Sequence, residues 1–334
     1  MPAIVPVLVL ILLSFSGCAA PFIEHSGPIE PGSRLFSLSI DGREREYLLH
    51  LPPKSVCEGP LPLVVVFHGY ASSARSTERG TGMSDKADRE GFIAVYPQAA
   101  GFIRTTWNAG FCCGDAYLQG VADLKFFKKL IETLRSNLNI DSARIYVAGF
   151  SNGGMMAYSI ATQMPNAIAA IAVVSATAGI RSVESHNARS IPAPLVSVPL
   201  IGFHGMKDRH IPYHGGEGKR TKDVLEFYSV AQSLAFWISA NGCEKIPARD
   251  TMRDGTVDKD SYACQDHEDI VFYSLRDGGH AWPVDGDCSG EGKCVSATDV
   301  IWEFFRAHPK RNNVSGADAP KAITPEVSMN KSGM

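Results

Sequence analysis

A serine flanked by glycines is the first feature of this sequence that could support covalent chemistry. Ser151 lies in the pattern Gly-x-Ser-x-Gly, with Gly149 before it and Gly153 after it. An apolar segment typical of a buried strand (145–149) precedes the serine, and a segment typical of a helix follows. A strand-to-helix turn of this kind exposes a serine above a sheet, with glycines where side chains would collide. The pattern therefore predicts that Ser151 is a nucleophile.

A nucleophilic serine needs a histidine base, and the base needs a carboxylate that orients it. Asp208 lies in the loop after the apolar segment 198–205, and His280 follows the apolar segment 269–275 after two glycines. The order serine, acid, histidine is the one found in α/β-hydrolases. Ligand sites in open α/β sheets form at the carboxyl ends of the strands. We therefore expect Asp208 and His280 to form a triad with Ser151.

The attacked carbonyl oxygen becomes negatively charged and needs two backbone donors. The N–H groups of Asn152, at the start of the predicted helix, and of Tyr70, in the turn after the first core strand, are the expected donors. The rings of Tyr70, Trp107 and Trp282 lie close to these motifs and are expected to contact substrate. The alternative that the rings only fill the core remains open. His68 is expected to be structural.

Strands and helices alternate through most of the chain, and the strands read as continuous apolar runs. A β-hairpin (35–40 and 46–51) opens the series, and further strands are predicted at 61–67, 92–96, 145–149, 168–176, 198–205 and 269–275. Helices are predicted near 85–89 and at 121–138, 151–164, 224–242 and 299–308. This pattern predicts a single α/β domain with a mostly parallel, doubly wound sheet that has helices on both faces.

The first residues read as an export signal. The run 3–15 is apolar and uncharged, too short to span a bilayer as a helix but typical of a secretory signal. The segment ending in Cys18 resembles a bacterial lipoprotein signal, in which a lipidated Cys18 anchors the mature protein to a membrane surface. The alternative is cleavage after Ala20, which gives a soluble exported protein. We expect an extracellular, periplasmic or cell-envelope location.

The domain boundaries follow from these composition changes. We expect a signal segment over 1–20, a linker rich in proline, glycine and serine over 21–34, and a catalytic domain over 35–309. The last segment, 310–334, is polar and is expected to be disordered. The net charge of −3 gives no basic surface of the kind that binds nucleic acid, so no nucleic-acid partner is expected.

The chain contains eight cysteines, and export would allow them to form disulfides. With Cys18 set aside the number is odd, which leaves one thiol free or paired with another molecule. Cys112 and Cys113 are not expected to bond each other, because adjacent Cα atoms across a trans peptide lie about 3.8 Å apart, below the usual disulfide range. No cysteine pair has the spacing of a zinc site, so no metal is expected.

Seven segments together resemble a known family, the secreted esterases of the polyhydroxybutyrate depolymerase and feruloyl esterase type. The segments are HGY (68–70), DREGFIAVYP (88–97), WNAGFCCGDA (107–116), RIYVAGFSNGGMMAY (144–158), HGMKDRHIPY (204–213), NGC (241–243) and GGHAWP (278–283). The resemblance implies an α/β-hydrolase fold, with Ser151 as the nucleophile, Asp208 as the acid and His280 as the base.

The resemblance also implies a disulfide between Cys243 and Cys264. Cys288 and Cys294, near the histidine loop, look peculiar to this chain and are interpreted as a second pair that staples the loop. The chain departs from the family at Ala122, where a second aspartate usually stands beside Asp123. This departure concerns the hydrogen bonds at the start of a helix rather than the chemistry.

A serine esterase that forms an acyl-enzyme is the predicted function, and it needs no metal and no organic cofactor. The expected substrates are extracellular and polymer-linked: polyhydroxybutyrate-type polyesters, or feruloyl and acetyl esters of polysaccharides. No long lid insertion separates the motifs, so an open site is expected. Two alternatives remain open, a serine peptidase of the same fold and a non-catalytic relative that binds polymer.

Overall fold

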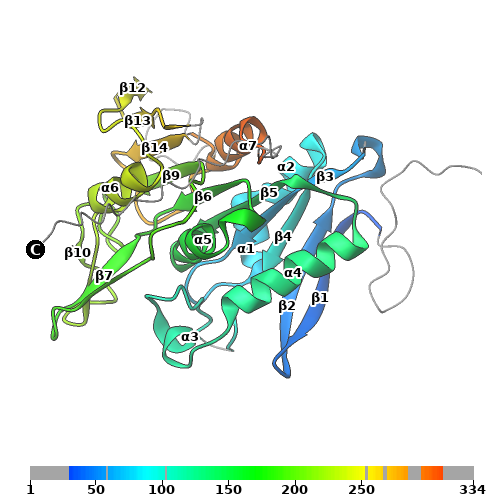
Figure 1. Cartoon of the computed structure of the whole chain (residues 1–334), viewed down its shortest axis with the longest axis horizontal. Helices are drawn as coiled ribbons and strands as arrows, with labels where there is room; N and C mark the ends of the chain where they lie inside the picture. Colours follow the sequence, from blue (N-terminus) through cyan, green and yellow to red (C-terminus); the bar gives the residue numbers. More distant parts are fainter. Residues whose placement is uncertain are drawn as a thin grey trace, which may run out of the picture.

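A ten-stranded sheet covered by helices on both faces forms the body of the molecule (Figure 1). The computed structural model describes residues 30–57, 59–101, 104–252, 255–265, 269–284 and 295–310. The strand order is β1-β2-β4-β3-β5-β6-β9-β14-β13-β12. The signal segment with Cys18, residues 21–29 of the predicted linker, Cys288, Cys294 and residues 311–334 of the predicted tail lie outside the described residues. Among the described helices, none is long and apolar enough to cross a bilayer.

Six strands pair in parallel at the centre of the sheet. They are β3 (Leu61–Phe67), β4 (Ile93–Pro97), β5 (Ile140–Phe150), β6 (Ala170–Val174), β9 (Leu200–Gly205) and β14 (Ile270–Leu275). Their central residues are apolar and buried because helices cover both faces of the sheet. The predicted parallel sheet is confirmed.

Antiparallel strands close both edges of this sheet. On one side, β1 (Gly32–Ile40) and β2 (Arg43–Leu51) form the predicted hairpin, turning at Asp41 and Gly42 with φ of 50° and 76°. The domain therefore begins before the predicted boundary at residue 35. On the other side lie β13 (Val257–Tyr262) and β12 (Ala248–Met252), which are rich in polar and charged residues and were not predicted.

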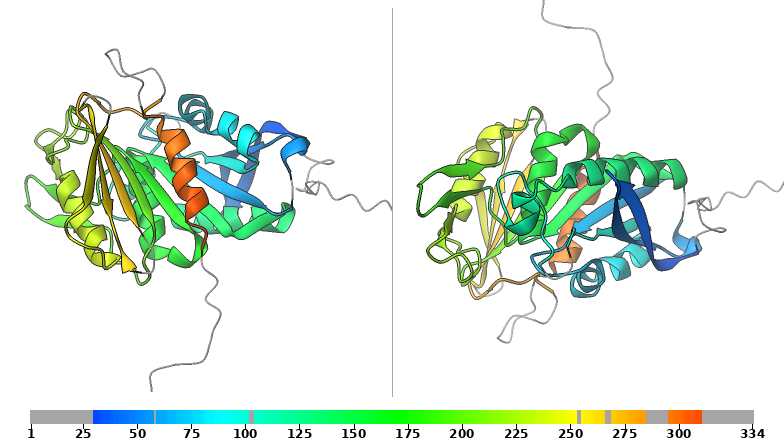
Figure 2. Two further views of the ribbon diagram at one scale, coloured as in Figure 1. Left: turned by 90° about the horizontal axis from the view of Figure 1, so that it is seen from above. Right: turned by 90° about the horizontal axis from the view of Figure 1, so that it is seen from below.

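The helices divide into two layers, which Figure 2 shows from above and below. The helices α4 (Asp123–Asn137), α5 (Asn152–Gln163) and α6 (Val230–Ala240) pack on one face of the sheet. The other face is covered by α1 (Ala74–Thr81), α2 (Met83–Glu90) and α7 (Ala297–Ala307). Three short helical segments, η1 (Lys54–Val56), α3 (Gly114–Leu118) and η2 (Pro165–Ala167), lie in loops. The prediction of a doubly wound sheet is confirmed.

A second, four-stranded antiparallel sheet lies beside the main one. It consists of β7 (Gly179–Ser182), β8 (Ala188–Ser190), β10 (Gly216–Glu217) and β11 (Leu225–Phe227), in the order β10-β11-β7-β8. The prediction of a helix over 224–242 is therefore wrong in its first part. The helix begins only after Ser229, whose side chain accepts a hydrogen bond from the Gln232 N–H while the Gln232 side chain accepts one from Ser229 N–H.

Two disulfides are present in the described part of the chain. One joins Cys243 to Cys264, as the family resemblance implied. The other joins Cys112 to Cys113, so the prediction that these neighbours do not bond is wrong. The Cα atoms of this pair are 3.2 Å apart across a cis peptide, closer still than the trans distance considered in the prediction, and the bond forms all the same. None of the described cysteines, Cys57 included, is a free thiol; the remaining three cysteines lie outside the described residues, so the odd-number argument is not tested.

Candidate active site

Ser151 occupies a sharp turn between β5 and α5. Its φ of 56° and ψ of −122° lie in a region that non-glycine residues rarely adopt. The two flanking glycines make this turn possible. A Cβ at Gly149 would collide with the carbonyl group of Gly153, and a Cβ at Gly153 would collide with the carbonyl oxygen of Phe67. The tight packing holds the serine at the carboxyl end of the sheet.

The three residues predicted to form a triad lie in a row, with His280 within hydrogen-bond distance of both Ser151 and Asp208. His280 Nε2 is 3.0 Å from Ser151 Oγ, and His280 Nδ1 is 2.7 Å from Asp208 Oδ2. Because an ionised carboxylate can only accept hydrogen bonds, Nδ1 carries the proton. Nε2 of the neutral ring is then free to accept the Ser151 hydroxyl proton.

Asp208 is buried, and both of its carboxylate oxygens accept hydrogen bonds. Its Oδ1 accepts hydrogen bonds from the backbone N–H groups of His210 (2.7 Å) and Ile211 (3.0 Å). Its Oδ2 lies 3.3 Å from Nε2 of the buried His204, as well as contacting His280. Burial by itself would raise the pKa of Asp208, but the hydrogen bonds from His204 and His280 outweigh it and hold the pKa well below its usual range. The carboxylate therefore stays ionised.

The loops that carry Asp208 and His280 are bound to each other through their backbones. Lys207 N–H donates to the Gly278 carbonyl group at 2.9 Å, and Met206 N–H donates to that of Leu275 at 2.8 Å. A Cβ at Gly205 would collide with the backbone of Gly278, so the approach depends on glycine. The distance between acid and histidine is thus fixed by the ends of β9 and β14, which are adjacent parallel strands.

Both residues expected to supply the oxyanion donors, Asn152 and Tyr70, line the same cavity as Ser151. The first hydrogen bond of α5 runs from Met155 N–H to the Ser151 carbonyl group, so the Asn152 N–H has no acceptor within the helix. The Asn152 side chain makes two hydrogen bonds to the backbone of Trp107, at 2.7 and 3.1 Å, and fixes that loop. Tyr70 lies at the cavity surface, and the next residue, Ala71, is held by the Thr105 carbonyl group.

Two of the three aromatic residues do not lie where the sequence predicted. Trp107 is completely buried, packs edge-on against Phe67, and donates its indole N–H to the His68 carbonyl group. Trp282 donates its indole N–H to Thr298, and neither tryptophan lines the cavity beside the serine. The prediction that they contact substrate is wrong, and the alternative of core filling holds for Trp107. Only Tyr70 reaches the cavity.

His68 is structural, as predicted. Its Nδ1 donates to the Gly69 carbonyl group at 2.7 Å, and its Nε2 accepts from Ala99 N–H at 3.0 Å. Burial lowers the pKa of His68 to about 4, so the ring is neutral. The departure at Ala122 has no visible cost, because the neighbouring Asp123 accepts hydrogen bonds from Asn108 N–H and Arg45.

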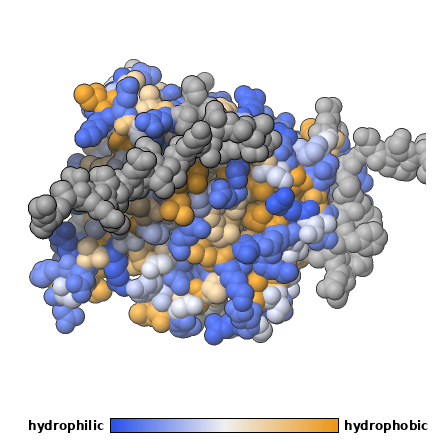
Figure 3. All heavy atoms as spheres, in the orientation of Figure 1, coloured by the Kyte–Doolittle hydropathy of each residue, from blue (hydrophilic) through white to orange (hydrophobic). Residues whose placement is uncertain are grey.

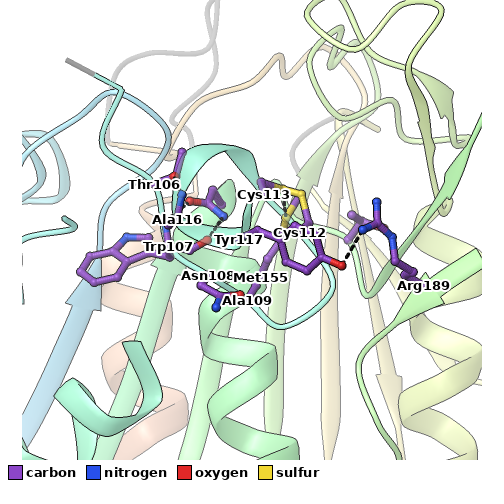
Figure 4. The surroundings of a disulfide bond; sticks show 12 residues. Thr106, Trp107, Asn108, Ala109, Cys112, Cys113, Ala116, Tyr117, Met155 and Arg189 are labelled. Atoms are coloured by element: carbon purple, nitrogen blue, oxygen red, sulfur yellow. Dashed lines mark hydrogen bonds between the residues drawn. A yellow bond between two sulfur atoms is a disulfide. The ribbon is translucent and has the colours of Figure 1, made fainter. Parts of the chain in front are cut away.

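Ser151 and His280 line a cavity of about 650 Å³. One wall carries the Cys112–Cys113 disulfide beside Tyr117, and the sulfur atoms of Cys113 and Met155 are 3.6 Å apart (Figure 4). The second sheet forms another wall with Ile180, Leu225 and Phe227. This sheet was not predicted, because strands of only two to four residues escape detection in the sequence, and the prediction that no long lid insertion is present stays a prediction.

The sequence analysis missed two histidines around the acid. His204 contacts Asp208, and the ring centroid of His210 lies 4.9 Å from that of His280. The stretch HGMKDRH, with a histidine on either side of Asp208, was the available signal. Asp208, His210 and His280 offer ligand atoms within 4.8 Å of one another, a spacing that could hold a metal ion. Such an ion would displace the hydrogen bond between Asp208 and His280.

Sequence comparisons relate the chain to esterases. The family model described as esterase PHB depolymerase matches residues 45–194. Feruloyl esterase B of Piromyces equi is 25% identical over 264 residues, which cover 78% of this chain and 45% of that protein. Putative esterase NocK of Nocardia uniformis subsp. tsuyamanensis is 27% identical, covering 78% and 76%. The bifunctional acetylxylan esterase/xylanase XynS20E of Neocallimastix patriciarum is 31% identical, covering 69% and 32%. The chain thus spans less than half the length of two of these relatives.

Solved structures confirm the fold. Acetyl xylan esterase from Aspergillus awamori superposes with a TM-score of 0.54 at 14% identity, covering 82% of this chain and 99% of that one. The protein named sOPH gives a TM-score of 0.55 at 15% identity, covering 84% and 89%. Fold, family model and relatives agree: the chain has an α/β-hydrolase fold, residues 45–194 match the esterase PHB depolymerase family, and the relatives it resembles are named esterases.

Proposed function

We propose that the protein is a carboxylic ester hydrolase that works through a catalytic triad of Ser151, His280 and Asp208. The observation that carries the proposal is the chain of contacts from Ser151 Oγ to His280 (3.0 Å) and from His280 to Asp208 (2.7 Å). This chain begins at a hydroxyl group that lines the cavity and ends at a buried carboxylate that stays ionised. Such an arrangement fits acyl transfer.

In the first step, His280 Nε2 takes the Ser151 hydroxyl proton while Oγ attacks the ester carbonyl carbon. Asp208 stabilises the resulting imidazolium ion through Nδ1. The backbone N–H groups of Asn152 and Tyr70 donate to the oxyanion, and the partial positive charge at the start of α5 adds to their effect. His280 then protonates the departing alcohol, and an acyl group remains on Ser151.

In the second step, His280 removes a proton from water, which attacks the acyl-enzyme. The oxyanion forms again and collapses, the acid leaves, and Ser151 recovers its proton. Every proton movement passes through one ring nitrogen, His280 Nε2, because Nδ1 is held by Asp208. None of these steps requires a cofactor.

We propose esters of aromatic or hydroxyalkanoyl acids, linked to a larger alcohol or polymer, as the substrate class. The cavity is large enough for a phenylpropenoyl or short aliphatic acyl group, and apolar side chains of the second sheet line it. Relatives are named feruloyl esterase and acetylxylan esterase. The test is a panel of feruloyl, acetyl and 3-hydroxybutyryl esters beside long-chain triglycerides. Much faster cleavage of the triglycerides would contradict this substrate class.

We also propose that the protein is exported, with a mature chain that begins at or just after Cys18. The support is the short uncharged apolar run followed by small residues. Intact-mass measurement of the protein from its native host distinguishes a diacylated Cys18 from cleavage after Ala20. Recovery of a cytosolic protein that keeps Met1 would contradict export.

A further inference from the structure

The strand register of the second sheet places one arginine on the cavity side. Ile180 of β7 pairs with Arg189 of β8 and with Phe227 of β11. Directly paired residues share one face of a sheet, and all three of these residues line the cavity. The neighbours Arg181 and Glu226 pair with each other and point to the opposite face.

Tyrosines hold two arginines at the cavity wall. Arg189 donates a hydrogen bond to Tyr117 Oη at 2.6 Å, and its guanidinium carbon lies 4.8 Å from the centre of that ring (Figure 4). Arg220 lies 5.3 Å from the ring centre of Tyr70. Each tyrosine also lines the cavity. These contacts favour a defined position for each cation without neutralising its charge.

The positive charge at this wall is not balanced by nearby carboxylates. The cavity lining contains Arg189, Arg220 and two histidines, and no aspartate or glutamate of the described residues. Among the described residues, the ion pairs within 4.0 Å that involve an arginine are those of Arg45, Arg89, Arg144, Arg249 and Arg276, so neither cavity arginine has a carboxylate at that distance. Burial, and after it the charges of His280, Arg220 and Lys219, lower the pKa of His210, while the charge of Asp208 acts in the opposite direction.

We propose that Arg189 and Arg220 bind a carboxylate on the substrate, so that the cavity selects esters that carry a negative charge. The inference rests on the proposed ester hydrolysis at Ser151 and names a substrate feature for that site. The apolar side chains Ile180, Leu225 and Phe227 contact the carbon chain, and the arginines contact its charged end. Guanidinium groups suit this role because their N–H donors match the two carboxylate oxygens.

The test compares two substrates that differ only at the far end of the acyl chain. Mono-4-nitrophenyl adipate ends in a carboxylate, and 4-nitrophenyl hexanoate ends in a methyl group. The variants are R189Q, R220Q and the double variant. The matched control is R181Q, which removes the same charge from the opposite face of the same small sheet.

For the wild type we expect kcat/KM for the adipate to exceed that for the hexanoate, mostly through KM. The double variant should lose about tenfold of this preference, and R181Q should keep it. Raising the salt concentration from about 0.05 to 0.5 M should reduce the preference, because exposed charges are screened. Thermal unfolding of each variant, compared with that of the wild type, serves as the control for folding.

The proposal would be overturned if the wild type did not prefer the adipate, or if the double variant kept the full preference. The ester hydrolysis itself would stand, because the hexanoate reports on it separately. If the wild type cleaves neither ester, both the proposed function and this inference are wrong.

Discussion

The triad and the cavity wall beside it come from parts of the molecule with opposite character. Ser151, Asp208 and His280 follow β5, β9 and β14, whose central residues are apolar and buried. The wall comes from the second sheet, in which every residue of β8 is exposed, and from loop residues such as Leu118 (79% exposed) and Val224 (63% exposed). Apolar and polar residues are also mixed over the face of the molecule that Figure 3 shows.

Because the two regions differ in packing, the proposed chemistry and the choice of substrate depend on different parts of the molecule. The positions of the proposed catalytic groups depend on close packing, such as the contact of Gly149 with Gly153, which leaves no room for a Cβ. The wall combines buried residues such as Ile180 and Phe227 with exposed ones such as Leu118 and Val224, and the exposed ones can change with small effects on stability. We therefore expect substitutions in the first region to affect chemistry or folding strongly, and substitutions in the second to affect substrate choice.

The largest effect is expected from S151A. Removing the nucleophile of a triad lowers kcat on the order of a millionfold, while the thermal unfolding temperature should stay close to that of the wild type. The measurements are steady-state hydrolysis of 4-nitrophenyl butyrate and thermal unfolding followed by circular dichroism. A variant that keeps a tenth of the activity would place the nucleophile elsewhere.

The next largest effect is expected from D208N. The amide cannot stabilise the His280 imidazolium ion and favours the wrong tautomer, so kcat should fall about 10⁴-fold. H204N is a milder companion, because it removes one neighbour of Asp208 and leaves the contact with His280 intact. Equal losses in the two variants would mean that Asp208 acts only as part of the packing.

Stability should depend on pH through the same carboxylate. The pKa of Asp208 lies lower in the folded protein than the value of about 3.9 for the unfolded chain, so the unfolded chain binds more protons in acid. The stabilisation is fully present above that value and is lost as pH falls below it. Urea unfolding between pH 6 and pH 3 should show a smaller loss for D208N than for the wild type. Parallel losses in both would exclude Asp208 as a source of the dependence.

A moderate effect on stability is expected from removing the Cys243–Cys264 disulfide. The bond closes a loop over a sequence separation of 21, for which the chain-entropy estimate is about 3 kcal/mol. The double variant C243A/C264A should unfold at lower urea concentration and keep its kcat, because the bond lies away from the cavity lining. A large fall in kcat without a change in stability would connect this edge of the sheet to catalysis.

The smallest effect is expected in the wall. V224A should change the free energy of unfolding by less than about 0.5 kcal/mol, because Val224 is largely exposed. It should change KM severalfold for bulky acyl groups and leave kcat for acetyl esters nearly unaltered. A loss of stability beyond about 2 kcal/mol would show that the wall is as tightly packed as the core, and the contrast between the two regions would fail.

The same contrast explains what the sequence could predict. Long apolar runs and the glycines around Ser151 have local signatures, so the parallel sheet and the convergence of Ser151, Asp208 and His280 were predictable. The second sheet was not, because its short strands lack a periodic pattern, and 225–227 joined smoothly to the helix that follows. The placement of Trp107 was missed because proximity in sequence to a motif does not show which way a ring points. The Cys112–Cys113 bond required a peptide geometry that the sequence does not reveal.

We propose Ser151 as the nucleophile that accepts the acyl group, and this role can be tested directly. The most direct measurement is reaction of the full chain with a fluorophosphonate, followed by peptide mass spectrometry to locate the adduct. We expect one phosphonyl group on Ser151, with activity lost in proportion to labelling. D208N should be labelled more slowly than the wild type. A fully inactivated protein with an unmodified Ser151, or an adduct on another residue, would contradict it.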